Sequence, residues 1–133
     1  MQVVGERRNP QLKFLKNQVK YVISGNKTLE PRPRSIRWIN IFEKAEMVDL
    51  TFGPRFRMPV VFATAKLTKV EIRPFETVTR DDLRQISRGW EEKDPKEFME
   101  VHNKWYANEL AKGYPVAWIY FEIVKRFIAE DDL

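Results

Sequence analysis

The residues best suited to binding or catalysis follow a turn early in the chain. A Gly-Asn pair at positions 25 and 26 is typical of a turn, and Lys27 comes directly after it. A lysine in this place can point its ammonium group into a cleft, as a compact positive charge for a phosphate or a polarised carbonyl group. Arg32, Arg34 and Arg37 follow at short intervals and offer planar guanidinium groups to the same kind of ligand. The segment therefore predicts a site for an anion.

Two prolines set the geometry of this segment. Pro31 and Pro33 bias the residues before them, Glu30 and Arg32, towards an extended backbone, because a residue before proline avoids the α region. Alternate side chains of an extended chain share one face, so Glu30, Arg32 and Arg34 should lie together. Lysine and arginine are rarely buried without partners, and we expect this face to form one wall of a cleft. Glu30 would either pair with the arginines or, in an enzyme, act as a general base.

Aromatic residues accompany the cations. Trp38 offers a stacking face for an unpaired base, although the apolar residues at positions 39 and 41 favour a place for it in the core. Arg55 and Arg57 flank a phenylalanine in an expected hairpin loop and could grip a nucleic acid backbone from the opposite wall. Stacking and positive charge together are what single-stranded RNA recognition needs. The predicted nucleic-acid-binding residues are Lys27, Arg32, Arg34, Arg37, Trp38, Arg55 and Arg57.

Other chemistries have less support in the sequence. The chain has no cysteine, which excludes disulfides, thiolate zinc sites and cysteine nucleophiles. His102 is the single histidine, and it lacks the companions of a metal site or a catalytic triad. No Gly-rich phosphate loop occurs. We therefore expect neither a bound metal nor a cofactor.

The charge of the chain is unevenly distributed. Residues 1–38 hold nine Lys or Arg and two Glu, whereas the net charge of the whole chain is +5. A basic first third on a near-neutral body favours one electropositive face, although a solvated basic surface is the simpler explanation of the excess alone. No apolar run approaches the length of a membrane span, and residues 1–10 do not resemble a secretory signal. We expect a cytoplasmic protein that forms a single domain over residues 1–133.

The periodicity of apolar residues predicts an α+β fold. Residues 9–24 fit either one helix or a strand at 12–15 followed by a helix at 16–24. A capping box beginning at Thr79 and an Asp94-Pro95 pair open two helices that end near Gly89 and Gly113. The pattern also predicts strands at residues 46–52, 59–72 and 116–124. We expect a mostly antiparallel sheet that curls into a small β-barrel with flanking helices.

The string Gly25-Asn26-Lys27-Thr28-Leu29-Glu30-Pro31-Arg32 resembles the Gly-x-Lys-x-x-Thr-x-Arg signature of the ASCH domain family. The order of the expected elements extends the resemblance over nearly the whole chain, including the acidic helix start after Thr79 and the Gly89-Trp90 turn. The family is PUA-like in fold, and most of its members look like RNA-binding modules. The resemblance therefore implies a PUA-like barrel that takes RNA, single-stranded or structured, or a nucleotide-like ligand.

Two positions depart from the family pattern. Some small relatives are amide hydrolases acting on acylated cytidine nucleosides, with a lysine, a threonine and a glutamate as the catalytic set. Only Lys27 carries over, because Glu30 stands in the place of the threonine and Arg88 near that of the glutamate. The alternative to a binding protein is thus a hydrolase of modified nucleosides, or a nuclease, with Lys27 and Glu30 as catalytic residues. A protein-interaction module with an acidic partner is a third possibility.

Overall fold

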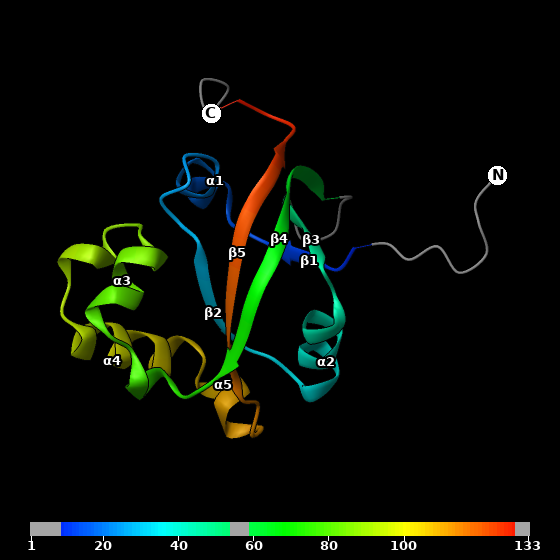
Figure 1. Cartoon of the computed structure of the whole chain (residues 1–133). Helices are drawn as coiled ribbons and strands as arrows, with labels where there is room; N and C mark the ends of the chain where they lie inside the picture. Colours follow the sequence, from blue (N-terminus) through cyan, green and yellow to red (C-terminus); the bar gives the residue numbers. More distant parts are fainter. Residues whose placement is uncertain (1–8, 54–58, 130–133) are drawn as a thin grey trace.

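A curved five-stranded sheet is the frame of the molecule. The computed structural model describes residues 9–53 and 59–129, and in it the strands lie in the order β1-β3-β4-β5-β2. The β1–β3 pair is parallel, and the other three pairs of neighbouring strands are antiparallel. Figure 1 shows the two long strands in the middle of the sheet. The strand bounds are β1 Gln11–Lys13, β2 Leu29–Pro33, β3 Met47–Phe52, β4 Val60–Ile72 and β5 Val116–Arg126.

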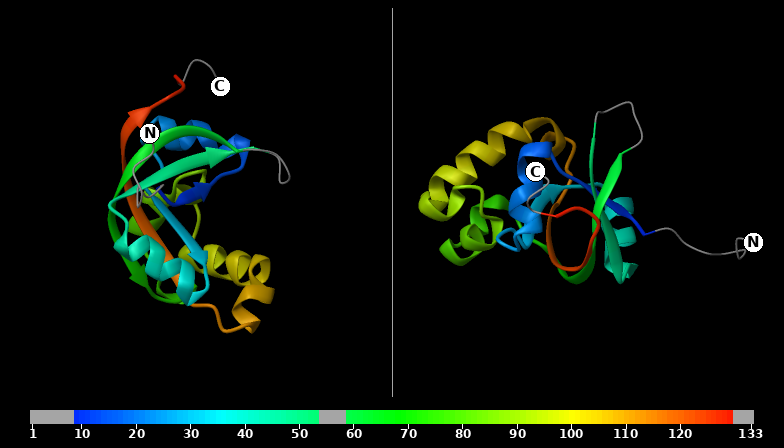
Figure 2. Two further views of the ribbon diagram at one scale, coloured as in Figure 1. Left: turned by 90° about the vertical axis from the view of Figure 1, so that its right-hand side faces the viewer. Right: turned by 90° about the horizontal axis from the view of Figure 1, so that it is seen from above.

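Irregular pairing bends the sheet. The register between β4 and β5 shifts between Thr64 and Ala65 and again between Leu67 and Lys69, and the β3–β4 register shifts at Leu50/Thr51. A bulge increases the local twist and bends its strand, so three irregularities along the central strands curl the sheet. Figure 2 shows the resulting half-barrel from the side and from above. The predicted α+β class and the curled, mostly antiparallel sheet are confirmed.

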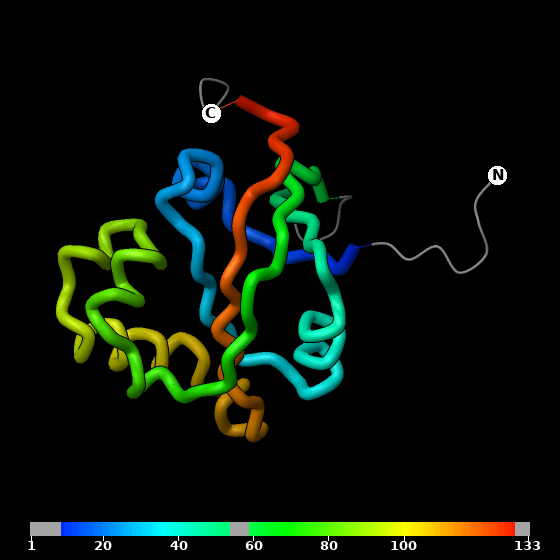
Figure 3. Tube along the Cα trace, in the orientation of Figure 1, coloured from blue at the N-terminus to red at the C-terminus, as the bar shows by residue number. Residues whose placement is uncertain are grey.

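Helices cover this half-barrel on different sides. In Figure 1, α3 and α4 lie beside β2 and β5, whereas α2 lies on the side of β3 and β4. Figure 3 follows the chain from β1 through α1 into β2. In the described ranges, no helix is both long and apolar enough to cross a membrane. The bounds are α1 Lys16–Ile23, α2 Ile36–Lys44, α3 Arg80–Ile86, α4 Pro95–Trp105 and α5 Ala107–Ala111, with short 3₁₀ turns at η1 Phe75–Thr77 and η2 Trp90–Glu92.

Strand β5 separates two hydrophobic cores. Ala117, Ile119 and Phe121 pack into the core inside the curl of the sheet. Val116 and Trp118 face the other way and pack under α3 and α4. The alternation predicted for residues 116–124 is thus confirmed, and each face of the strand has its own core.

One helix was missing from the sequence prediction. Helix α2 begins directly after the extended segment of the two prolines, with Ser35 as its N-cap. Ile39 and Phe42 are three residues apart, so they lie on the same face of the helix, and both are buried. In the preceding region, the strand-then-helix alternative for residues 9–24 is the one observed, as β1 and α1.

A polar network ties α3 to the sheet. The capping box predicted at Thr79 is present, and the Asp82 carboxylate accepts the backbone N–H of Thr79 at 2.9 Å. The same carboxylate accepts two hydrogen bonds from the guanidinium group of Arg73, each at 2.9 Å. That guanidinium lies 3.8 Å from the ring centre of Trp118. Asp82 therefore joins a helix start, a bidentate ion pair and the second core.

We predict that Asp82→Ala lowers the free energy of unfolding by about 2–3 kcal/mol, because the backbone N–H of Thr79 loses its acceptor in the capping box and Arg73 loses a charged acceptor. Denaturant unfolding followed by circular dichroism measures the change. Asp81→Ala is the matched control: its ion pair with Arg84 at 3.0 Å joins two exposed side chains, so we expect a change below about 1 kcal/mol. Equal effects of the two substitutions would contradict the assignment.

Candidate ligand-binding cleft

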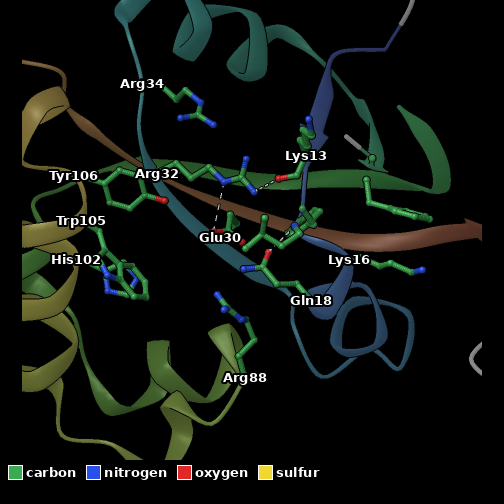
Figure 4. A pocket seen from close by; sticks show the side chains of 14 residues that line it. Lys13, Lys16, Gln18, Glu30, Arg32, Arg34, Arg88, His102, Trp105 and Tyr106 are labelled. Atoms are coloured by element: carbon green, nitrogen blue, oxygen red, sulfur yellow. Dashed lines mark hydrogen bonds and ion pairs between the residues drawn. The ribbon is translucent and has the colours of Figure 1, made fainter. Parts of the chain in front are cut away.

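A cleft of about 960 Å³ opens beside β2. Figure 4 shows that its side chains come from β1 and α1, from β2, from the segment after α3 and from the end of α4. Side chains from remote parts of the sequence thus meet at one hollow. The lining residues are Lys13, Phe14, Leu15, Lys16, Gln18, Glu30, Arg32, Arg34, Phe52, Gly53, Arg88, His102, Trp105 and Tyr106.

A buried ion pair joins Glu30, which lines the cleft, to Lys27, which does not. Lys27 is 1% exposed, and its Nζ lies 3.1 Å from Oε2 of Glu30, which is 8% exposed. The same ammonium group donates hydrogen bonds to the carbonyl oxygens of Leu29 at 3.1 Å and Ile86 at 3.2 Å. Ile86 is the last residue of α3, where carbonyls have no partner within the helix. Lys27 therefore fastens β2 to the end of α3.

The charges of this pair support each other. Burial lowers the pKa of Lys27, and the neighbouring Glu30 carboxylate opposes that shift. Burial on its own would raise the pKa of Glu30, but Lys27 and Arg32 hold that pKa below its usual value. Oε1 of Glu30 lies 3.5 Å from Nε of Arg32. Glu30 thus carries its negative charge inside the protein and orients the first arginine of the wall.

Arginines form the cationic wall. Arg32 donates from Nη2 to the carbonyl oxygen of Lys13, and its guanidinium lies 5.2 Å from the ring centre of Phe14. Arg34 donates from Nη1 to the carbonyl oxygen of Pro33 at 3.0 Å. Burial and the positive charge of Arg32 lower the pKa of Arg34. Glu30 is the one carboxylate among the described lining residues, so the wall has an excess of positive charge.

A left-handed run of backbone places a third arginine. Ser87 and Arg88 have φ values of 62° and 63°, and Gly89 follows at 86°. Positive φ is costly for residues with side chains and often marks a functional site. In Figure 4, Arg88 points from this run towards Glu30 and Gln18. The amide of Gln18, turned with its oxygen towards Arg88, accepts from Nη1 and Nη2 at 2.6 and 3.2 Å.

Aromatic side chains from α4 and its C-cap form the facing wall. Trp105 is 59% exposed, and Tyr106 lies beside it with a pKa that burial raises. His102 stacks on Phe98 with ring centres 3.8 Å apart, and its Nδ1 lies 2.9 Å from the Phe98 carbonyl oxygen. Burial lowers the pKa of His102 to about 4, so the imidazole is neutral at physiological pH. This wall is therefore aromatic and uncharged.

The structure unites part of the predicted site. Glu30, Arg32 and Arg34 share one face of the extended segment and line the cleft together, as their spacing predicts. Lys27 does not line the cleft, and its ammonium group is held by three oxygen atoms, one of which belongs to Glu30. Arg55 and Arg57 lie outside the described residues.

Helix α2 displaces the remaining two residues. Arg37 is exposed on this helix and does not line the cleft. Trp38 is 48% exposed, so the core position favoured from sequence is wrong. The reason is the position about the helix axis: Ile39 and Phe42 occupy the buried face, and Trp38 lies at its margin, beside Phe42 and half exposed.

Several lining residues escaped sequence reasoning. Trp105 and Tyr106 are adjacent residues within the range expected for the helix that begins at Asp94-Pro95, and both reach the cleft. Arg88 was noted only as a departure from a family pattern. No motif or spacing in the sequence marks Gln18 or Lys13 as a binding residue. Among the described residues, no group of three or more His, Asp or Glu side chains could hold a metal ion.

Comparison with known proteins bears on the fold. No family model and no curated protein sequence matches the chain. A protein of the DUF984 family from Enterococcus faecalis has a TM-score of 0.58 at 19% identity, covering 87% of this chain and 72% of that one. A solution structure from Pyrococcus furiosus has a TM-score of 0.58 at 15% identity, covering 88% of this chain and 98% of that one.

An ASCH domain from Lactobacillus crispatus has a TM-score of 0.55 at 15% identity, covering 83% of this chain and 72% of that one. This chain has an ASCH-like fold. The structural likeness agrees with the resemblance seen in residues 25–32, and identity this low speaks for the fold alone. In the ASCH-like fold of this chain, that segment contributes Glu30 and Arg32 to the lining of the cleft.

We predict that Lys27→Met lowers the free energy of unfolding by about 3–5 kcal/mol, because the buried Glu30 carboxylate loses the ammonium group at 3.1 Å and keeps only the more distant guanidinium of Arg32. The double variant Lys27→Met/Glu30→Gln should recover much of that loss. Denaturant unfolding measures both variants, with Lys20→Met, an exposed lysine of α1, as a control expected to change stability by less than about 0.5 kcal/mol. A Lys27→Met protein as stable as the control would refute the role of the pair.

The pH dependence of His102 can be measured directly, because the chain has one histidine and its imidazole ring protons can be assigned without ambiguity. We expect its imidazole to titrate near pH 4 in the folded protein, below the ordinary value of about 6.5. The unfolded chain then binds more protons between these two values, so this residue makes the protein less stable as the pH falls from about 6.5 to about 4.

Nuclear magnetic resonance of the ring protons against pH measures the midpoint. His102→Gln should reduce the loss of stability over the same pH interval. A midpoint near 6.5 would show that the ring is solvated and would contradict the packing of this wall.

Proposed function

We propose that the chain binds single-stranded RNA or a nucleotide-like ligand in the cleft beside β2. The observation that carries the proposal is the pairing of two unlike walls: Arg32, Arg34 and Arg88 on one side, Trp105 and Tyr106 on the other. A nucleotide has the same two parts, an anionic phosphate and a flat aromatic base.

The cationic wall suits phosphate. Guanidinium groups donate paired hydrogen bonds that match the oxygen atoms of a phosphate group, and they keep their charge when partly buried. Glu30 does not neutralise the wall, because Lys27, which does not line the cleft, balances its negative charge at 3.1 Å. Lys13 and Lys16 add positive charge at the cleft. An anion entering here meets donors that the protein has already oriented.

The aromatic wall suits an unpaired base. The exposed indole ring of Trp105 and the phenol of Tyr106 offer flat faces to a ring that enters between the walls. A cleft of about 960 Å³ lies within the range of about 300–1,000 Å³ common for ligand sites. Bases in a duplex are stacked and paired, so a single strand is the form of RNA that this cleft would take. The ASCH-like fold, whose family resembles RNA-binding modules, is consistent with this proposal.

The enzymatic alternative is less well supported by the site. A lysine that acts on an amide or a phosphodiester must reach the substrate, whereas Lys27 is buried and bound to three oxygen atoms. If the ammonium group of Lys27 moved into the cleft to reach a substrate, the Glu30 carboxylate and two backbone carbonyl groups would lose a buried donor. Glu30 does line the cleft, but its carboxylate is engaged by Lys27 and Arg32. We therefore propose binding as the function.

We predict that affinity for a short, labelled single-stranded RNA falls steeply with salt. Three phosphate contacts correspond to a slope of about −2 in log affinity against log salt, or a roughly 20-fold loss between about 50 and 200 mM. Arg34→Ala and Arg88→Ala should each weaken binding and reduce the slope by about 0.7. Fluorescence anisotropy measures all of these quantities.

Arg37→Ala is the matched control, because Arg37 is an equally charged residue close in sequence that lies outside the cleft. It should leave the affinity and the slope near the wild-type values. An affinity that does not change with salt, or an Arg37→Ala effect equal to that of Arg34→Ala, would count against the proposal.

A further inference from the structure

A second hollow adjoins the cleft. Its volume is about 430 Å³, and it lies between β1, the end of β2 and the start of α2. Lys13, Arg32 and Arg34 line both this hollow and the cleft. The same cations therefore serve two neighbouring spaces, and a ligand bound by them can extend into either one.

The second hollow has aromatic side chains of its own. Trp38, which is 48% exposed, and Tyr114 both line it. The ring of Trp38 lies beside that of the buried Phe42, with ring centres 6.3 Å apart. Ser35 fixes the turn that carries this tryptophan, because its Oγ accepts the backbone N–H of Trp38 at 3.5 Å. The core does not account for this exposed indole, whereas a ligand that stacks on it would.

The charges of the second hollow limit what can occupy it. Glu109 is the carboxylate on its wall among the described residues. A phosphate is favoured beside the shared cations and disfavoured beside Glu109, where an uncharged base can lie. The order along the surface is thus aromatic wall, cations and aromatic wall, with Tyr106 at one end and Trp38 at the other.

We propose that the ligand is a strand of at least two nucleotides whose linking phosphate binds Arg32 and Arg34 and whose second base stacks on Trp38. This inference rests on the proposed function and extends it from one nucleotide to a strand. The base, phosphate and base of a dinucleotide follow the same order as the three parts of this surface. A single nucleotide held in the cleft leaves Trp38 unused, because Trp38 lines only the second hollow.

Isothermal titration of a mononucleotide whose phosphate is a methyl ester, so that it carries the single charge of a phosphodiester, and of the corresponding dinucleoside monophosphate tests the proposal. Because one stacked base contributes about 1–3 kcal/mol, the wild-type protein should bind the dinucleotide roughly 5–150 times more tightly. In Trp38→Ala this ratio should fall to near one, and Trp38→Phe should restore part of it. Arg37→Ala, on the same helix but outside both hollows, should keep the wild-type ratio.

The possible outcomes distinguish failure of the dinucleotide inference from failure of the proposed binding function. A mononucleotide that binds as tightly as the dinucleotide overturns the inference, and so does a ratio that Trp38→Ala leaves unchanged, while the proposed function stands. Failure of the wild-type protein to bind either compound, or a short RNA, overturns the proposed function and the inference with it. Circular dichroism of each variant shows that a lost ratio reflects stacking and not unfolding.

Discussion

The fold of the cleft depends on one buried ion pair. Lys27 and Glu30 lie almost out of contact with water, at a separation of 3.1 Å, and each would be unfavourable there without the other. The lysine also serves the backbone, because it binds the carbonyl of Leu29 in β2 and that of Ile86 at the end of α3. A single ammonium group thereby joins a strand, a helix terminus and the carboxylate that orients Arg32. Hydrophobic side chains would fill this space, but they would neither bind the carbonyls nor orient the arginine.

The contact that Lys27 makes between β2 and the end of α3 sets the positions of the arginines in the cationic wall. Arg32 belongs to β2 and Arg34 follows it directly, whereas Arg88 lies two residues after Ile86, the last residue of α3. The positive-φ run through Ser87 turns Arg88 back towards Glu30, so three cations from two segments converge at one place. The opposite wall comes from α4, whose own core contacts through Phe98 keep His102 neutral. The site therefore has a charged side and an uncharged side for separate structural reasons.

Sequence reasoning succeeded where the signal was local. The cap at Thr79, the alternation along residues 116–124 and the common face of Glu30, Arg32 and Arg34 depend on neighbours a few residues apart, and the structure has all three. It failed where the decisive contact was distant. The three oxygen partners of Lys27 include a carbonyl 59 residues away, which no pattern in the sequence announces. Trp38 was misplaced because helix α2 was not expected directly after an extended segment, and rotation about that helix decides which side chain is buried.

The two prolines of β2 also govern the outer border of the sheet. The backbone N–H of Arg34 donates to the carbonyl oxygen of Pro115, and the carbonyl oxygen of Thr28 accepts from the backbone N–H of Phe121. The backbone groups of even-numbered residues in this segment therefore point towards β5, and those of odd-numbered residues point away from the sheet. Pro31 and Pro33 are odd-numbered, and their nitrogen atoms have no hydrogen to offer an incoming strand. The carbonyl of Leu29, on the same outward side, is already bound by Lys27. The border is therefore poor in free donors and acceptors, which protects this end of the half-barrel from joining another chain edge to edge in amyloid-like assembly.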